Sequence, residues 1–260
     1  MRTSCGTFGN IKWRFLFILA SVAIAATQSV AAPKGSANGG LPAILDLPGI
    51  SQTTVNVGGV SAVLLKNAHP KGAIILLAGG DGRIGVGENG AIARPGNQLV
   101  RTRGAYAQRG FAVLVPDCCV NVAAAVDYMR AYGHVTLAGT SRGTQRAAHG
   151  IAAGARPDRL VLTSGFLSDA SGDRDNVIAT LGSPDRLPAT LIVHHRQDAC
   201  PVTRPDGVKP FLDWSQGKAH VIWLDGGSVA GNNPCEAFAH HGFYGLDSAV
   251  VSAVSGFAAR

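Results

Sequence analysis

The sequence predicts an α/β fold in which a mostly parallel, doubly wound sheet follows an antiparallel hairpin. Short apolar runs bounded by Gly, Pro or Asp alternate with stretches whose apolar residues recur at helical spacing. Several of these runs are nearly continuous in hydrophobic residues, as expected of strands that are covered on both faces. Strands that alternate with helices in this way form parallel sheets with helical crossovers.

The individual elements can be assigned in chain order. Two strands, over 53–57 and 60–65, are joined at Gly58-Gly59 and are expected to form the hairpin. Six further strands are expected over 73–79, 111–117, 134–139, 159–165, 189–195 and 220–225. Helical spacing predicts helices over 97–110, 121–133, 144–154 and 246–260. No repeat, long linker or low-complexity tract suggests a second folded domain.

The N-terminus has the composition of a secretory signal peptide. Basic residues at positions 2, 12 and 14 precede an apolar run over 15–25, which is short for a membrane span. Small residues then offer a cleavage site after Ala31 or Ala32. We therefore expect a signal peptide over 1–31, an extended arm over 32–48 and one α/β domain over 49–260. An uncleaved membrane anchor is the alternative; after cleavage we expect no stable membrane insertion.

Charge and residue spacing argue against nucleic-acid and metal binding, and the cysteine content is compatible with disulfides. The formal net charge of +7 falls to about +4 when the leader and its three basic residues are removed. The remaining excess is not clustered and no aromatics interleave with it, so nucleic-acid binding is not expected. No ligand spacing typical of a structural metal occurs, and we expect neither a metal nor another cofactor. The even number of cysteines that remain is compatible with disulfides in an oxidising compartment.

The chemistry of the chain is expected at Ser141, in the pentapeptide "GTSRG" (residues 139–143). The pentapeptide alone is weak evidence, but here it lies between a predicted strand and a predicted helix. A nucleophile at such a turn needs small neighbours, because side chains at Gly139 and Gly143 would collide with the adjacent strand and helix. The N–H of Arg142 would then point at a developing oxyanion. An ordinary serine at a helix N-cap is the alternative.

A nucleophilic serine needs a base and an acid that orients the base, and in the order Ser, acid, His both lie downstream. Asp198 follows the strand over 189–195 and is the favoured acid, ahead of three acids placed less well: Asp206, Asp213 and Asp225.

The segment "AHHGFYG", before the last helix, offers His240 and His241 as the base, and position alone does not separate them. Two further histidines, His194 and His195, lie at a strand end and are expected to pack there or line the cleft.

The loop after the strand over 73–79 is expected to supply the second oxyanion donor, from Gly80 or Asp81. The same loop allows a rival interpretation. Residues 80–85 match Gly-x-Gly-x-x-Gly, and Asp117 ends the next strand like a ribose-binding acid, as in dinucleotide-dependent oxidoreductases. That fingerprint must open a helix, however, and the residues that follow it contain glycines and a proline without helical spacing. We therefore do not favour it.

Six segments in order, "LLAGGDGRIGVG", "LVRTRGAYAQRGFAVLVPD", "LAGTSRGT", "LVLTSG", "IVHHRQDACPVT" and "PCEAFAHHGFYGLDSAVV", resemble a group of exported bacterial α/β-hydrolase proteins. The resemblance spans nearly all of the chain after the leader. It implies an α/β-hydrolase fold over 49–260, and Ser141, Asp198 and His241 as nucleophile, acid and base. The signal peptide predicts a periplasmic or secreted location. One segment departs from the family, because the loop after Asp117 is shorter than usual.

Several expectations follow from this placement. If the triad forms, the acid and base loops are neighbours, and a Cys200–Cys235 disulfide would tie them together. Whether Cys118 and Cys119 are bonded to each other or free is left open.

We expect a carboxylesterase-like serine hydrolase that acts on a small-molecule ester, thioester or amide. The two dozen residues between the strands at 159–165 and 189–195 are too few for a large lid. The alternative is a non-catalytic binding protein on a degenerate hydrolase scaffold; the oligomeric state is not predicted.

Overall fold

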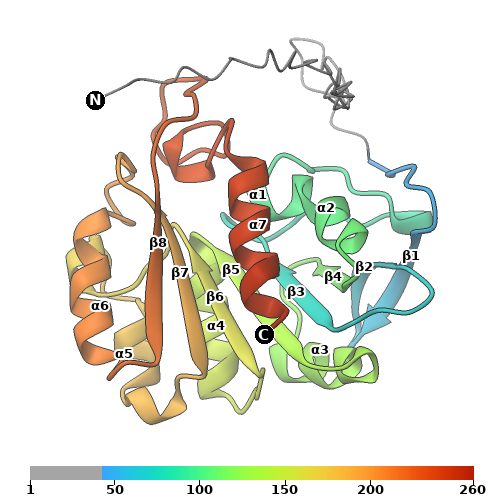
Figure 1. Cartoon of the computed structure of the whole chain (residues 1–260), viewed down its shortest axis with the longest axis horizontal. Coiled ribbons are helices and arrows are strands. Elements are labelled where there is room, and N and C mark those ends of the chain that lie inside the picture. The colour runs from blue at the N-terminus through green and yellow to red at the C-terminus, as the bar shows by residue number, and fades with distance from the viewer. Residues whose placement is uncertain (1–42) are drawn as a thin grey trace, which may run out of the picture. The chain divides into compact units, whose positions relative to one another are not determined.

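The computed structural model describes residues 43–260, so the predicted signal peptide and its cleavage site lie outside the described residues. Residues 43–50 form no helix or strand, and beyond them one eight-stranded sheet runs through the domain (Figure 1). Its strands are β1 (Ser51–Val57), β2 (Val60–Lys66), β3 (Ala73–Leu77), β4 (Ala112–Pro116), β5 (Val135–Thr140), β6 (Arg159–Thr163), β7 (Ala189–His195) and β8 (Ala219–Leu224).

The strand order is β1-β2-β4-β3-β5-β6-β7-β8. β2 is antiparallel to both β1 and β4, whereas every pairing from β4 through β8 is parallel. The predicted N-terminal hairpin and mostly parallel sheet are therefore confirmed. The carboxyl ends of the parallel strands all meet at one edge of the sheet, which is where ligand-binding loops collect in such folds.

Helices cover both faces of the sheet. The α-helices are α1 (Gln98–Arg101), α2 (Arg103–Gln108), α3 (Val122–Met129), α4 (Arg142–Ala152), α5 (Val177–Leu181), α6 (Val208–Trp214) and α7 (Asp247–Ala258). Short 3-10 helices are η1 (Glu88–Gly90), η2 (Arg130–Tyr132), η3 (Asp169–Ser171), η4 (Pro184–Arg186), η5 (Pro205–Gly207) and η6 (His240–Gly242). The connection from β6 to β7 holds only η3, α5 and η4, so no large lid is present there.

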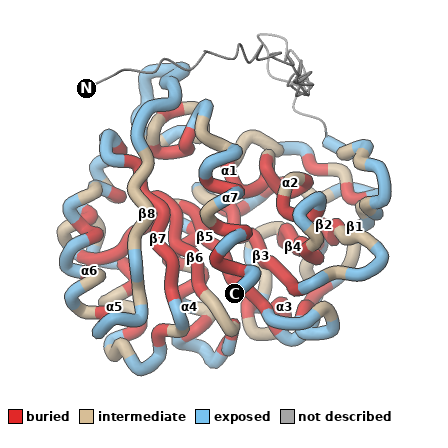
Figure 2. Tube along the Cα trace, in the orientation of Figure 1, coloured by how far each residue is buried: buried red, intermediate tan, exposed pale blue. Residues whose placement is uncertain are grey.

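The core consists of two apolar layers, one on each face of the sheet. Alternate side chains of a strand enter opposite layers: Ile75 lies in the layer that holds residues of α3 to α6, while Ile74 and Leu76 lie in the layer that holds residues of α1, α2 and α7. Figure 2 shows the central strands buried along most of their length, whereas the edge strands β1 and β8 are largely exposed or half-buried. Burial on both faces explains why the central strands are nearly continuous in apolar residues.

The helices differ from the sequence-based expectation in three places. The single helix expected over 97–110 is divided at Thr102 into α1 and α2. Two helices were not predicted at all: α5 is only five residues long, and α6 carries Pro210 in its first turn. A segment shorter than two turns shows no apolar periodicity, and a proline usually marks a loop. No helix within 43–260 has both the length and the apolar character needed to cross a bilayer.

Candidate active site

Ser141 lies on the sharp turn between β5 and α4. Its backbone has a φ of 52° and a ψ of −127°, a strained conformation for a residue with a side chain. The N–H of Ser141 donates to the Thr163 oxygen of β6 at 3.0 Å, so the neighbouring strand holds the turn. Strained backbone of this kind is typical of a strand-to-helix turn that presents a nucleophile above the sheet.

The two glycines of the pentapeptide are required by close packing. A Cβ at Gly139 would overlap the backbone oxygen of Gly143, and a Cβ at Gly143 would overlap the backbone oxygen of Leu77 on β3. Backbone atoms cannot move aside as the tip of a flexible side chain can. The start of α4 therefore approaches β3 and β5 only because both positions lack a side chain.

Asp198 and His241 lie together, although 43 residues separate them in the sequence. Asp198 follows β7, and His241 lies in η6, before α7. The Nδ1 of His241 is 3.0 Å from Oδ2 of Asp198, and the two side chains are 5% and 0% exposed. A carboxylate only accepts, so Nδ1 carries a proton and donates to it, and in the neutral imidazole this tautomer has its lone pair on Nε2.

Ser141 and His241 line one cavity of about 230 Å³. The other lining residues are Gly79, Gly80, Asn97, Gln98, Thr140, Cys235, Ala237 and Gly242. Of the predicted oxyanion donors, Gly80 borders this cavity, Arg142 begins α4 directly after Ser141, and Asp81 follows Gly80 in the loop. Within residues 43–260, no cluster of His, Cys, Asp or Glu is suited to hold a metal ion.

The other histidines considered from the sequence have different surroundings. The ring of His195 lies between two backbone partners: Nε2 donates to the Gly226 oxygen at 2.9 Å and Nδ1 accepts from the Gln197 N–H at 3.0 Å. Burial lowers the pKa of both His194 and His195, so both favour the neutral form. His240 stacks on His195 at 4.3 Å between ring centroids, and among the described hydrogen bonds it is His241, not His240, that contacts Asp198.

The acids that competed with Asp198 lie elsewhere. Asp213 pairs with Lys209 at 2.7 Å and Asp225 with Arg196 at 3.2 Å, and in both pairs the side chains are more than half exposed. Asp206 lies in η5, the turn that precedes α6. None of these three forms a hydrogen bond to His241 among the bonds that the structure describes.

The dinucleotide interpretation lacks the backbone that it requires. The Gly82 N–H donates to the Gly79 oxygen at 3.1 Å, which closes a turn, and the next α-helix begins only at Gln98. Asp117 accepts N–H groups from Ile84 and Val86, at 2.9 and 3.0 Å, and from the next residue along the chain. Burial opposes ionisation of Asp117, but these N–H groups outweigh it and lower its pKa. The carboxylate thus organises the loop after β3.

Thr203 is a site residue that the sequence did not reveal. Its hydroxyl, fully buried, lies 3.2 Å from Oδ2 of Asp198 and 3.0 Å from Nδ1 of His241. The N–H of Cys200 donates to the other carboxylate oxygen, Oδ1, at 3.0 Å. The carboxylate is thereby held on both oxygens. A threonine five residues after an acid has no recognisable spacing, so only the folded loop identifies this residue.

We expect Thr203→Val to lower kcat about threefold to tenfold while KM changes little, because one net hydrogen bond of about 1 kcal/mol is lost. Valine keeps the shape of the side chain and removes only the hydroxyl. Thr203→Ser, which restores the hydroxyl, should retain most of the activity. Steady-state kinetics of the three proteins check this. Equal kcat values for Thr203→Val and wild type would show that the hydroxyl does not position the pair.

Arg101 holds the backbone on both sides of His241. Its guanidinium donates to the Ala237 oxygen at 3.0 Å and the Gly242 oxygen at 2.7 Å, and pairs with Asp247 at the start of α7. Ser164, the residue directly after β6, donates to the backbone oxygen of His241 at 2.6 Å. The loop that carries the histidine is therefore attached to α1, β6 and α7.

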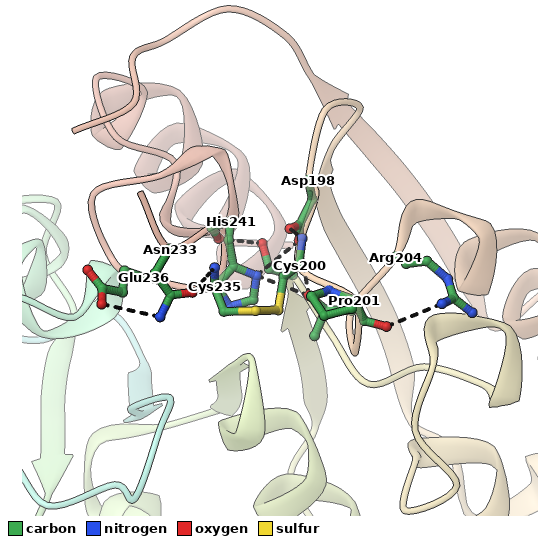
Figure 3. The surroundings of a disulfide bond; sticks show 10 residues. Asp198, Cys200, Pro201, Arg204, Asn233, Cys235, Glu236 and His241 are labelled. Atoms are coloured by element: carbon green, nitrogen blue, oxygen red, sulfur yellow. Dashed lines mark hydrogen bonds and ion pairs between the residues drawn. A yellow bond between two sulfur atoms is a disulfide. The ribbon is translucent and has the colours of Figure 1, made fainter. Parts of the chain in front are cut away.

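A disulfide joins the acid loop to the base loop. Cys200 and Cys235 are bonded, with a Cα–Cα distance of 4.7 Å. Figure 3 shows this bond beside His241 and Asp198. Cys118 and Cys119, in the short connection from β4 to α3, are bonded to each other.

Replacing both Cys200 and Cys235 with serine is expected to lower the free energy of unfolding by about 3–4 kcal/mol, since the bond closes a loop of 35 residues. Urea unfolding without reductant, followed by circular dichroism, measures the change. Because Cys118 and Cys119 are intact in this variant, the effect belongs to the Cys200–Cys235 bond alone. An unchanged unfolding midpoint would contradict the expectation.

Comparison with known proteins identifies the fold. No protein-family model matches the chain, and no curated protein matches it at a significant level. Solved structures do. An esterase/lipase from an uncultured bacterium matches with a TM-score of 0.55 and 17% identity, covering 83% of this chain and 86% of that one. The chain has the α/β-hydrolase fold.

Two further structures match over a similar extent. Dienelactone hydrolase from Anabaena variabilis has a TM-score of 0.56 and 15% identity, covering 80% of this chain and 95% of that one. Est1E from Butyrivibrio proteoclasticus has a TM-score of 0.54 and 15% identity, covering 80% and 97%. At such low identity the likeness concerns the fold alone.

Proposed function

We propose that the protein is a serine hydrolase that cleaves a carboxylic ester or a related bond through Ser141, His241 and Asp198. One observation carries the proposal: a serine on a strained strand-to-helix turn shares a cavity with a histidine that is bonded to a buried carboxylate. This is the arrangement that serine nucleophiles require, whatever the fold. The similarity of the fold to esterases and to a dienelactone hydrolase supports the same class of reaction.

The proposed reaction has two balanced halves. Ser141 Oγ attacks the carbonyl carbon as its proton passes to His241 Nε2, and the carbonyl electron pair moves onto oxygen. N–H groups of Arg142 and of Gly80 or Asp81 stabilise this oxyanion. The bond to the leaving oxygen then breaks, and that oxygen takes the proton from Nε2, leaving an acyl group on Ser141. Water then attacks the acyl carbon as its proton passes to Nε2 of His241. The bond to Ser141 Oγ breaks, and Oγ takes the proton back, which releases the acid and restores the serine.

Asp198 is proposed to hold the imidazole in the productive tautomer and to stabilise its charge once Nε2 is protonated. No cofactor takes part in this scheme. The imidazole is the only proton carrier between the nucleophile and the leaving group, and the carboxylate does not itself become protonated.

The proposed substrate is a small or unhindered ester. The cavity at Ser141 has a volume of about 230 Å³, and its lining residues are small or polar, with no leucine, isoleucine, valine or phenylalanine among them. A long acyl chain would need an apolar channel instead. Thioesters and amides with equally small groups can undergo the same reaction.

The two disulfides are typical of an oxidising compartment, so we propose a periplasmic or secreted location.

The test is hydrolysis of p-nitrophenyl esters of graded chain length by the purified protein. We expect measurable turnover, with kcat/KM higher for the acetate or butyrate than for the octanoate. Activity that rises with chain length would move the substrate assignment to long-chain esters. A folded protein that hydrolyses none of the esters, thioesters or amides tested would instead favour a binding protein on a hydrolase scaffold.

A further inference from the structure

Arg146 lies one helical turn after Arg142 on α4, and its guanidinium is bonded to the loop that follows β3. Nη1 donates to the backbone oxygen of Gly80 at 3.1 Å. Nη2 donates to the backbone oxygens of Ala78 and, at 3.4 Å, of Gly79. One side chain thus contacts three consecutive carbonyl groups, which a planar guanidinium with several fixed donors suits better than any other side chain.

These bonds determine where the N–H groups of the same loop point. A trans peptide is planar, so its N–H points in the opposite direction from its carbonyl oxygen. The oxygens of Gly79 and Gly80 are directed at Arg146, and the N–H groups in the same two peptides belong to Gly80 and Asp81. Both N–H groups are therefore directed away from Arg146. Gly80 borders the cavity that also contains Ser141 and His241.

The turn is closed around the guanidinium. The N–H of Gly82 donates to the Gly79 oxygen at 3.1 Å, the same oxygen that Arg146 contacts. A Cβ added at Gly82 would lie 3.0 Å from Cζ of Arg146, and the φ of Gly82 is +76°. At the other end of the turn, a Cβ on Gly79 would lie 3.1 Å from Cβ of Ser141. The loop therefore packs against the Arg146 guanidinium at Gly82 and against Ser141 at Gly79.

The hydrogen bonds of Arg146 end on the backbone and not on a carboxylate, while the charge of Asp81 attracts the guanidinium without a hydrogen bond among those described. The acid nearest in the loop, Asp81, pairs with Arg94 at 3.2 Å. Each hydrogen bond that the structure describes for the Arg146 side chain ends on one of the three loop oxygens. An arginine that served only as a surface charge would not need this geometry.

We propose that Arg146 is a positioning residue that directs the N–H groups of Gly80 and Asp81 toward the oxyanion formed at Ser141. The inference rests on the proposed function, since it requires a tetrahedral oxyanion at that serine. Without the guanidinium, the peptides at Gly79 and Gly80 are free to rotate, and a rotated peptide presents oxygen in place of N–H. The loss falls on the transition state, where the negative charge is present, more than on substrate binding.

The test compares Arg146→Gln and Arg146→Lys with wild type, using p-nitrophenyl acetate as substrate and a small trifluoromethyl ketone as inhibitor. The ketone forms a reversible adduct with the serine whose oxyanion occupies the same site as that of the intermediate. We expect Arg146→Gln to lower kcat roughly 10- to 100-fold, somewhat less than direct removal of an oxyanion donor. KM should stay within about threefold, and Ki of the ketone should rise in proportion to the loss in kcat. Arg146→Lys should be intermediate.

The matched control is Arg156→Gln. Arg156 follows the other end of α4 and also donates to backbone oxygens, those of Ala155 at 3.0 Å and Ile151 at 3.4 Å. The substitution Arg156→Gln removes the same kind of bond at the other end of α4 and should leave kcat and Ki unchanged. Because Ki does not depend on the fraction of protein that is folded, a destabilised Arg146 variant still gives a valid value.

The outcomes separate the two proposals. An active wild type with an unchanged Ki in Arg146→Gln overturns the role of Arg146 and leaves the proposed function intact. An equal rise of Ki in Arg156→Gln also overturns it, because the effect would then be general. A folded wild type that neither hydrolyses the ester nor binds the ketone contradicts the proposed function itself, and the role of Arg146 with it.

Discussion

Ser141→Ala and His241→Ala are each expected to lower kcat for a short p-nitrophenyl ester by roughly 10⁵- to 10⁶-fold. In the proposed mechanism neither residue works without the other, because the serine is a weak nucleophile until the imidazole takes its proton. The double variant should therefore lose little more than either single variant. Steady-state kinetics at saturating ester measure all three. Losses that multiply in the double variant would contradict a shared proton transfer between Ser141 and His241.

The matched control for His241 is its neighbour. His240→Ala removes an equally large ring that stacks on His195 and has no hydrogen bond to Asp198 among those described. We expect kcat to remain within about tenfold of wild type, because only packing is altered. If His240→Ala is instead the inactive variant, the base has been assigned to the wrong histidine.

Asp198→Asn is expected to lower kcat by roughly 10⁴-fold, and the structure supplies the reason. The N–H of Cys200 donates to Oδ1 of Asp198, so an asparagine will place its oxygen there and its NH₂ group at the position of Oδ2. That NH₂ group would face Nδ1 of His241, now 3.0 Å from Oδ2. An NH₂ donor selects the tautomer with the proton on Nε2, and such an imidazole cannot accept the proton of Ser141.

Asp213→Asn provides the comparison for this variant. Asp213 was one of the competing acids, and its exposed side chain pairs with Lys209 on the same helix. Loss of an exposed pair costs little, so kcat and stability should match wild type. The assignment of Asp198 fails if its amide variant retains wild-type kcat, or if Asp213→Asn is the one that loses activity.

The sheet could be predicted from the sequence because burial on both faces leaves a clear signal. Strands such as β3 and β4 are continuous apolar runs between turn-forming residues. The short helices α5 and α6 leave no such signal. The turn at Ser141 was predictable for a related reason, since the close approach of α4 to β3 and β5 demands glycines at fixed positions.

The residues that hold the site in place could not be predicted in this way. Arg101 and Asp247 are 146 positions apart, and Arg146 contacts oxygens 66 to 68 positions before it. Thr203 joins two loops whose proximity exists only after folding. Such contacts depend on the path of the loops between strands, which apolar periodicity does not describe. Backbone oxygens, moreover, are present at every residue and carry no sequence signal.

Covalent labelling with a fluorophosphonate, followed by mass spectrometry of the labelled peptides, tests directly whether Ser141 is an activated nucleophile. The phosphonate phosphorus is attacked by an activated serine oxygen, and fluoride leaves. We expect a single adduct on Ser141 in the wild-type protein and none in Ser141→Ala, with both proteins shown to be folded by circular dichroism. A folded wild type that stays unlabelled, or an adduct on a different serine such as Ser164, would show that Ser141 is not the nucleophile.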